Sequence, residues 1–468
     1  MLKILNAPII FYLGSRVFSA AGNLFAVAIF TRLVGPVDYG HYLLIYAWST
    51  IVFGFATQWI GFAYFGVYEA KRINEYVNSL FQLIAIALVM LVGGFAAMTW
   101  LGFWQPEFLV AVCVLVICMS VYQNALQVSR TKLDPRAGAI SMIMRAGLTI
   151  ALGSSVLWWG GGATGLAFAI GLANLIAAVP SLMSAGRIDL LQGSRAASLR
   201  IIKYGWPLML SMGVMSLGQS VDRLLLGHYV GIAALGTYGV LCDSTRQFFY
   251  VVGESINFSM ITNAKQHIHE GNNEASTNAL LAAFNASFAT AALGAAFLIV
   301  FGDQIVRVLL GSQFHGDAGS LIPILAIAFG ILLLGQFYFN QAIFFSEASF
   351  LEPILQTALV LVSAAVSVLL IPIYGQQGAA FAILTAVSVY SIGFIVIGRQ
   401  YFRMPIDYKG IAIISMVAMI FVFGAWMLDR VAPETAISQV SKVAVFVGLS
   451  AFVVHRFGLL RHTPTETI

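Results

Sequence analysis

Charged residues are scarce in this chain of 468 residues. Aspartate, glutamate, lysine and arginine make up 9% of it, against 60% hydrophobic residues, and the mean hydropathy is +0.90. Soluble globular domains carry about 25% charged residues, so this composition excludes that class. The sequence therefore predicts an integral membrane protein.

Cysteine and nucleotide-binding motifs are also scarce. Cys113, Cys118 and Cys242 all fall in apolar runs, with no CxxC pair and no Cys/His ligand spacing, so we expect neither disulfides nor structural zinc. His267 and His269 share a polar turn with two glutamates, which we interpret as incidental rather than metal-binding. The chain has no GxxxxGK[ST] motif. We expect no metal, no cofactor and no ATPase activity, so any transport would use an ion gradient, the membrane potential or consumption of its product.

Long apolar runs are abundant. A helix of about twenty residues crosses the ~30 Å of hydrocarbon in a bilayer. Such runs occur near residues 9–31, 42–66, 80–103, 108–128, 138–159, 163–185, 205–230, 233–260, 279–301, 321–345, 353–373, 377–398, 410–428 and 437–455. They predict an all-α polytopic membrane protein with about 14 transmembrane helices.

Basic residues predict the orientation, because lysine and arginine favour cytoplasmic loops. A cytoplasmic N-terminus places sixteen basic residues on the cytoplasmic side and four outside, namely Arg32, Arg307, Arg430 and Lys442. The C-terminus is then cytoplasmic too. The first run continues past Arg16, which predicts a retained helix rather than a cleaved signal. The net charge of +5 thus reflects topology, and we expect no nucleic-acid partner.

The chain repeats itself. VGPVDYGHY at residues 34–42 and VGIAALGTY at residues 230–238 share the pattern VGxxxxGxY, 196 residues apart. GLAFA at 165–169 and GAAFA at 378–382 share GxAFA, and Pro135 and Pro353 fall at the start of equivalent spans. Two halves of six spans have the same orientation, so the repeat axis should lie along the membrane normal, with substrate bound between the halves.

The repeat predicts the domain organisation. We expect an N-terminal six-helix lobe at 1–185, a cytoplasmic linker at 186–204, a C-terminal six-helix lobe at 205–400, and two additional transmembrane helices with a short tail at 401–468.

Four arginines lie within the predicted spans and suggest an anionic passenger. Arg246 follows about thirteen residues of apolar run, ~20 Å deep at ~1.5 Å per residue, where a charge is tolerated mainly in a bundle interior or a wet cavity. Arg223 lies near the external end of its helix and leans back into the membrane. Arg16 and Arg145 lie near cytoplasmic ends, where they either face the cavity or reach the headgroups.

Polar and acidic residues accompany these arginines. Ser120, Gln123, Asn124 and Gln127 recur at helical spacing in the fourth span, and Gln336 and Asn340 mark the tenth; these side chains either bind sugar hydroxyls or join neighbouring helices. Asp222, Asp243 and Glu254 lie in spans of the second half. They are candidates for ion coupling, or they only balance the arginines, and Asp243 is spaced to face Arg246 on one side of a helix.

The segments TRLVGPVDYGHY and SVDRLLLGHYVGIAALGTYG, with twelve repeated spans and two appended ones, resemble the polysaccharide flippases of the Wzx type. Their superfamily, the multidrug/oligosaccharidyl-lipid/polysaccharide exporters, also contains lipid II flippases and multidrug antiporters. The resemblance implies two lobes around a cavity that opens alternately to each side of the bacterial inner membrane. It also implies that the passenger is an undecaprenyl-pyrophosphate-linked oligosaccharide, moved from cytoplasm to periplasm for O-antigen, capsule or exopolysaccharide assembly.

Under that resemblance, Arg16, Arg145, Arg223 and Arg246 would hold the diphosphate, because guanidinium forms paired bonds to phosphate oxygens, and Gln123, Asn124, Gln127 and Asn340 would contact sugars. The polyprenyl tail would stay among the membrane lipids, and a polysaccharide polymerase or export complex is a candidate partner.

Two alternatives stay open. A proton- or sodium-coupled multidrug antiporter has the same architecture, although a cationic passenger suits a first half with two arginines and no deep acid poorly. A membrane-embedded glycan polymerase would need catalytic groups in an external loop, and the longest one, 302–320, carries only Asp303 and Asp317.

Overall fold

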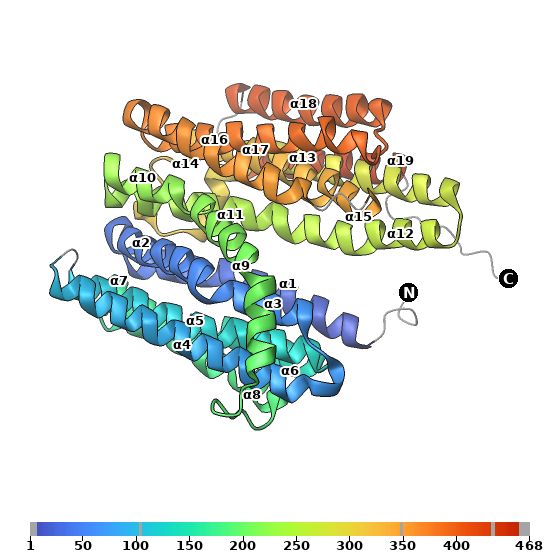
Figure 1. The fold of residues 1–468 in the computed structure, drawn as a ribbon. Coiled ribbons are helices and arrows are strands. Elements are labelled where there is room, and N and C mark those ends of the chain that lie inside the picture. The colour runs from blue at the N-terminus through green and yellow to red at the C-terminus, as the bar shows by residue number, and fades with distance from the viewer. Residues whose placement is uncertain (1–6, 103–104, 347–349, 432–435, 458–468) are drawn as a thin grey trace. The chain divides into compact units, whose positions relative to one another are not determined.

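The computed structural model describes residues 7–102, 105–346, 350–431 and 436–457, and its regular elements within those ranges are all helices (Figure 1). The all-α class is therefore confirmed. In chain order the helices are α1 (Ala7–Leu33), α2 (Pro36–Phe53), η1 (Gly54–Gln58), α3 (Trp59–Val67), η2 (Ala70–Arg72), α4 (Ile73–Trp100), α5 (Pro106–Thr131), α6 (Pro135–Trp158), α7 (Gly162–Ala177), α8 (Val179–Ala185), α9 (Arg195–Gly218), α10 (Val221–Tyr229), α11 (Ile232–Ile256), η3 (Asn257–Ile261), α12 (Thr262–His269), α13 (Asn273–Leu309), η4 (Ser312–Phe314), α14 (Ala318–Phe337), η5 (Phe339–Gln341), α15 (Ala342–Ser346), α16 (Leu351–Tyr374), α17 (Gln376–Val396), η6 (Gly398–Gln400), α18 (Tyr408–Val431) and α19 (Ala436–Arg456).

Each of the fourteen predicted spans coincides with one of these helices or with consecutive ones. Eleven helical stretches among the described residues are long and apolar enough to cross a membrane. The other three predicted spans correspond to α1, to α9 with α10, and to α11 with η3. These three carry Arg16, Arg223 and Arg246. The last two of these spans each contain at least one acid and an arginine, which is typical of helices that face a polar interior rather than lipid.

Several helices begin where the local sequence favours it. Proline, which needs no backbone N–H partner, occupies the first position of α2, α5 and α6. The carboxylate of Asp134 caps α6 by accepting a hydrogen bond from the Ala137 N–H at 3.1 Å. Helix α9 begins at Arg195, so the last ten residues of the stretch expected as a linker are helical.

Internal contacts divide the chain into two compact units, one comprising Met1–Val240 with Leu310–Phe314 and the other comprising Leu241–Leu309 with His315–Ile468. In the first unit α2, α5 and α7 pack against one another, α6 packs against α1 and α7, and α9 packs against α3 (Figure 1). Buried side chains such as Tyr64, Leu80 and Ile201 join α3, α4 and α9 in one apolar cluster. The division at Val240 groups α9 and α10 with the first six spans, and the expected lobe boundaries stay a prediction.

In the second unit, α14 packs against α13 and α17, and α16 packs against α17. The appended helix α18 lies along α13, where Phe421 and Phe446 of α18 and α19 meet Phe301 in a shared apolar cluster. Lys442 of α19, which is predicted to lie on the external side, is 1% exposed within a membrane-length helix, where its ammonium binds the carboxylate of Asp429.

The GxAFA repeat has the same structural role in both halves. A Cβ atom added to Gly165 would lie 2.7 Å from Val156 of the preceding helix α6, and one added to Gly378 would lie 2.3 Å from the Leu370 carbonyl oxygen of the preceding helix α16. The alanines of both motifs are buried, whereas Phe168 and Phe381 are 38% and 39% exposed. Glycine at these positions permits close approach of consecutive helices, and the matching burial indicates that the repeat extends to packing.

Candidate functional site

Arg246 and Asp243 form an ion pair on α11, with Nη2 of the arginine 2.7 Å from Oδ1 of the aspartate. Their spacing of three residues places both on one face of the helix, as the sequence predicts. The arginine side chain nevertheless stays 33% exposed and the aspartate 28%. Halfway along a membrane-length run, an exposed charged pair is stable only beside water or a polar ligand.

A second polar contact lies one turn further along α11. The hydroxyl of Tyr250 donates to Oε1 of Gln336 on α14 at 2.7 Å, so Gln336, which the sequence singles out, contacts α11. Glu254, one more turn along, is half-buried and lies near Tyr250. The stripe from Asp243 to Glu254 is therefore continuous on the helix.

The adjacent residues Asp222 and Arg223 lie in α10 and are both buried. Tyr238 donates its hydroxyl proton to Oδ2 of Asp222 at 2.9 Å, which joins α10 to α11. Arg223 is thus packed within the protein in this conformation, rather than extended to a membrane surface.

The guanidinium of Arg145 on α6 contacts an aromatic ring of the helix α5. Its guanidinium carbon lies 5.3 Å from the centre of the ring of Tyr122 on α5, a cation–π distance. Tyr122 itself is buried in the first unit. Arg16 lies in α1, but its side chain is outside the described part of the structure.

The polar side chains of α5 differ in whether they pack against other helices or stay accessible. Asn124 is buried, donates to the Ser120 carbonyl at 2.8 Å, and lies so close to α3 that a Cβ on Gly61 would come within 2.2 Å of its Oδ1. Gln127 accepts a hydrogen bond from Arg130 at 3.1 Å, and Gln123 is half-buried. Asn124 therefore joins helices here, whereas Gln123 and Gln127 keep surface available to a ligand.

Asn340 lies in η5 and is buried, and the sequence gave no indication of its acidic neighbour. Its side chain lies beside the carboxyl group of Glu352, in the first turn of α16. Glu352 escapes sequence reasoning because the apolar run predicts a span that begins at 353, one residue later. The signal that could have found it is an acid beside Pro353, in the first turn of a membrane-length helix.

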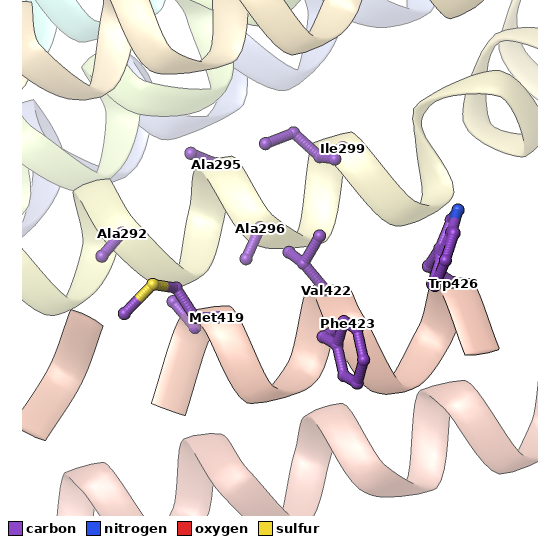
Figure 2. A pocket seen from close by; sticks show the side chains of 9 residues that line it. Ala292, Ala295, Ala296, Ile299, Met419, Val422, Phe423 and Trp426 are labelled. Atoms are coloured by element: carbon purple, nitrogen blue, oxygen red, sulfur yellow. The ribbon is translucent and has the colours of Figure 1, made fainter. Parts of the chain in front are cut away.

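An apolar groove of about 510 Å³ runs between α13 and α18 in the second unit. Small side chains of α13 form its floor, among them Ala292 and Ala296, and Phe423 and Trp426 of α18 form its wall (Figure 2). Such a surface suits a hydrocarbon chain. No group of three His, Cys, Asp or Glu side chains is placed to hold a metal ion in the part of the chain that the structure describes.

Comparison with known proteins identifies similar chains. The model of a family described as "Polysaccharide biosynthesis protein" matches residues 7–244. The solved structure of the lipid II flippase MurJ in an inward closed conformation is similar over 97% of this chain and 100% of that one, with a TM-score of 0.72 and 13% identity. An inward-facing multidrug resistance MATE family transporter of the MOP superfamily is similar over 86% of this chain and 96% of that one, with a TM-score of 0.53 and 16% identity. A search of the curated proteins finds no match.

Proposed function

Because the chain belongs to the polysaccharide biosynthesis protein family and has the fold of the MOP exporters, we propose that it is a flippase for a lipid-linked oligosaccharide. Its passenger would be an undecaprenyl-pyrophosphate-linked glycan, moved from the cytoplasmic to the periplasmic leaflet of the bacterial inner membrane by alternating access. Both termini would be cytoplasmic, and the glycan would serve O-antigen or exopolysaccharide assembly.

The observation that carries the proposal is the partial exposure of the Arg246 side chain. Asp243 occupies one of its nitrogen atoms at 2.7 Å, and a third of the side chain stays accessible. A planar guanidinium donates five N–H groups, so Arg246 can bind diphosphate oxygens without releasing Asp243. Phosphate held there would leave the polyprenyl tail in the lipid, and the groove between α13 and α18 would accept part of a hydrocarbon chain.

The other candidate binding residues differ in how directly they could contact the passenger in this conformation. Arg145, held against Tyr122, contributes positive charge to the first unit, as does Arg16. Gln123, Gln127 and Asn340 offer hydrogen bonds to sugar hydroxyls. Arg223 and Asn124 are buried in this conformation and would contact the passenger only if the helices rearranged during the cycle.

A multidrug antiporter is the second candidate function, because the fold is shared with a MATE family transporter. The acids of α11 and α16 would suit a cationic passenger better than the arginines do. Of the two solved neighbours described above, the lipid II flippase has the higher TM-score, 0.72 against 0.53, although identities of 13% and 16% speak for fold alone.

The test is translocation in proteoliposomes of a fluorescent undecaprenyl-pyrophosphate oligosaccharide, with an organic cation as the rival substrate. We expect glycolipid movement that collapses in Arg246→Ala and is partly kept in Arg246→Lys, which retains charge but not the planar fork. Movement of the cation alone would refute the flippase and favour the antiporter.

Two control variants separate binding from structure. Asp243→Asn removes the carboxylate that pairs with Arg246 but keeps the positive charge, so it should preserve or strengthen glycolipid binding. If Asp243→Asn reduced transport as much as Arg246→Ala does, the pair would be only structural. Arg307→Ala breaks a comparable pair with Asp303 on α13, where the arginine side chain is 56% exposed, and should leave transport unchanged.

A further inference from the structure

Glu352 is an acid that the proposed diphosphate site does not use. It lies in the first turn of α16, and the hydroxyl of Tyr390 on α17 lies 3.5 Å from each of its carboxyl oxygens. The side chain of Asn340 lies beside the same carboxyl group. No basic side chain among the described residues forms an ion pair with this carboxylate. A carboxylate at the edge of the membrane without a cation is more easily accommodated as the neutral acid.

Asn340 supplies a second, independent observation. Its side chain is 8% exposed, and its Oδ1 has no hydrogen-bond partner within the described residues. Buried acceptors are normally satisfied, so this one needs an explanation. A protonated Glu352 has an O–H group that can donate to the Asn340 oxygen once the amide rotates. The amide thus offers a donor to the ionised carboxylate and an acceptor to the neutral acid.

The titratable groups around Glu352 do not fix its charge. Tyr390 and Tyr250 are neutral over the working pH range. Tyr250 is close enough to interact electrostatically with Glu352, Glu254 and Arg246. The guanidinium of Arg246 is engaged by Asp243 on the same helix.

We propose that Glu352 is the proton-binding residue of the transport cycle, with Asn340 as the acceptor that holds the acid form. The step adds a proton from the aqueous phase to one carboxylate oxygen and breaks no other bond; release reverses it. The inference rests on the proposed function, because it couples proton binding to glycolipid movement. A proton needs only the one acid, whereas no group of three His, Cys, Asp or Glu side chains in the described part of the chain is placed to hold a metal ion.

Infrared difference spectroscopy between acidic and neutral pH tests proton binding directly, on the full-length protein in liposomes and without any glycolipid. We expect a protonated carboxyl band that disappears in Glu352→Gln and shifts in Asn340→Leu. Glu274→Gln, which changes an exposed acid in the first turn of α13, is the matched control and should leave this band in place. An unchanged band in Glu352→Gln overturns the inference. Glutamine keeps the shape and the hydrogen bonds, and Glu352→Asp, which should move the midpoint of the band, covers the case in which Gln does not fold.

A transport assay then tests coupling. An imposed pH gradient should accelerate glycolipid movement in the unmodified protein, and Glu352→Gln should reduce that acceleration on the order of ten-fold while a sodium gradient has no effect. Gradient-independent movement, or acceleration by sodium alone, refutes the coupling but leaves the flippase standing. Absence of glycolipid movement in the unmodified protein refutes the proposed function, whereas the infrared result still decides whether Glu352 binds a proton.

Discussion

Gly40 and Gly236, the corresponding glycines of the two VGxxxxGxY motifs, each lie against the helix that carries the other motif. A Cβ atom on Gly40 would come within 2.1 Å of the Ile232 carbonyl oxygen, and one on Gly236 within 2.0 Å of the Pro36 carbonyl oxygen. The contact between α2 and the start of α11 is therefore reciprocal. The motif therefore marks a helix crossing at which only glycine fits.

The first prediction follows from this crossing. Gly236→Val should force α2 and α11 apart, because the new side chain would meet backbone rather than a flexible side chain. Overpacking of this kind costs about 1–3 kcal/mol. We expect a lower thermal unfolding temperature in detergent and loss of glycolipid movement.

Gly93→Ala is the matched control for that variant. Gly93 lies in α4 with no atom within 4 Å of a Cβ built on it. Alanine there should be neutral or stabilising, by roughly 0.5–1 kcal/mol, because it restricts the unfolded chain and favours helix. If Gly236→Val were as stable as Gly93→Ala, the crossing would not require glycine.

The second prediction concerns Arg145. Removing the aromatic ring in Tyr122→Leu should cost about 0.5–2 kcal/mol of cation–π stabilisation and release the guanidinium, whereas Tyr122→Phe keeps the ring and should keep most of the stability. Thermal unfolding of the two variants compares them directly. Equal destabilisation by Leu and Phe would show that the tyrosine hydroxyl, rather than the ring, supports this region.

Much of the fold is predictable from the sequence because apolar runs and caps are local signals. The fourteen runs coincide with helices, and Pro36, Pro106 and Pro135 begin theirs. The repeat is also predictable from the sequence. Both motifs contain glycine at the helix crossing, where another residue would cause strain. The Asp243–Arg246 pair follows from helical spacing alone.

Side-chain partners from distant segments are not predictable in this way. Glu352 meets Tyr390 across 38 positions, and Tyr250 meets Gln336 across 86. The sequence identifies Lys442 only as a charge on the external side, and its contact with Asp429 of α18 is seen only in the structure. Each of these contacts depends on how the helices pack against one another. The periodicity of residues within one helix does not predict that packing.

The third prediction concerns Lys442 and Asp429. Asp429→Ala should destabilise the protein more than Lys442→Met does, because the first leaves a buried ammonium without a partner and the second leaves an aspartate that is 49% exposed. Thermal unfolding in detergent measures the order. A larger loss in Lys442→Met would mean that packing of the lysine stem, rather than its charge, stabilises the contact between α18 and α19.

The fourth prediction is a pH dependence at Asp407, which precedes α18. Its carboxylate accepts hydrogen bonds from the Gly410 N–H at 2.9 Å and the Asn285 amide at 3.1 Å, and these contacts hold the pKa of Asp407 below its ordinary value of 3.8. A lowered folded-state pKa stabilises the protein above the unfolded value, and this contribution is lost as the pH falls through the folded-state pKa.

Asp407→Asn tests that sign, because asparagine still caps the helix but cannot ionise. We expect the unmodified protein to be more stable than Asp407→Asn at neutral pH, with a difference that begins to shrink below about pH 4 and vanishes below the folded-state pKa. Asp407→Ala, which loses the cap as well, should cost about 1 kcal/mol more than Asp407→Asn at every pH. A stability difference between the unmodified protein and Asp407→Asn that persists into acid would instead assign the effect to hydrogen-bond geometry, with no contribution from the charge.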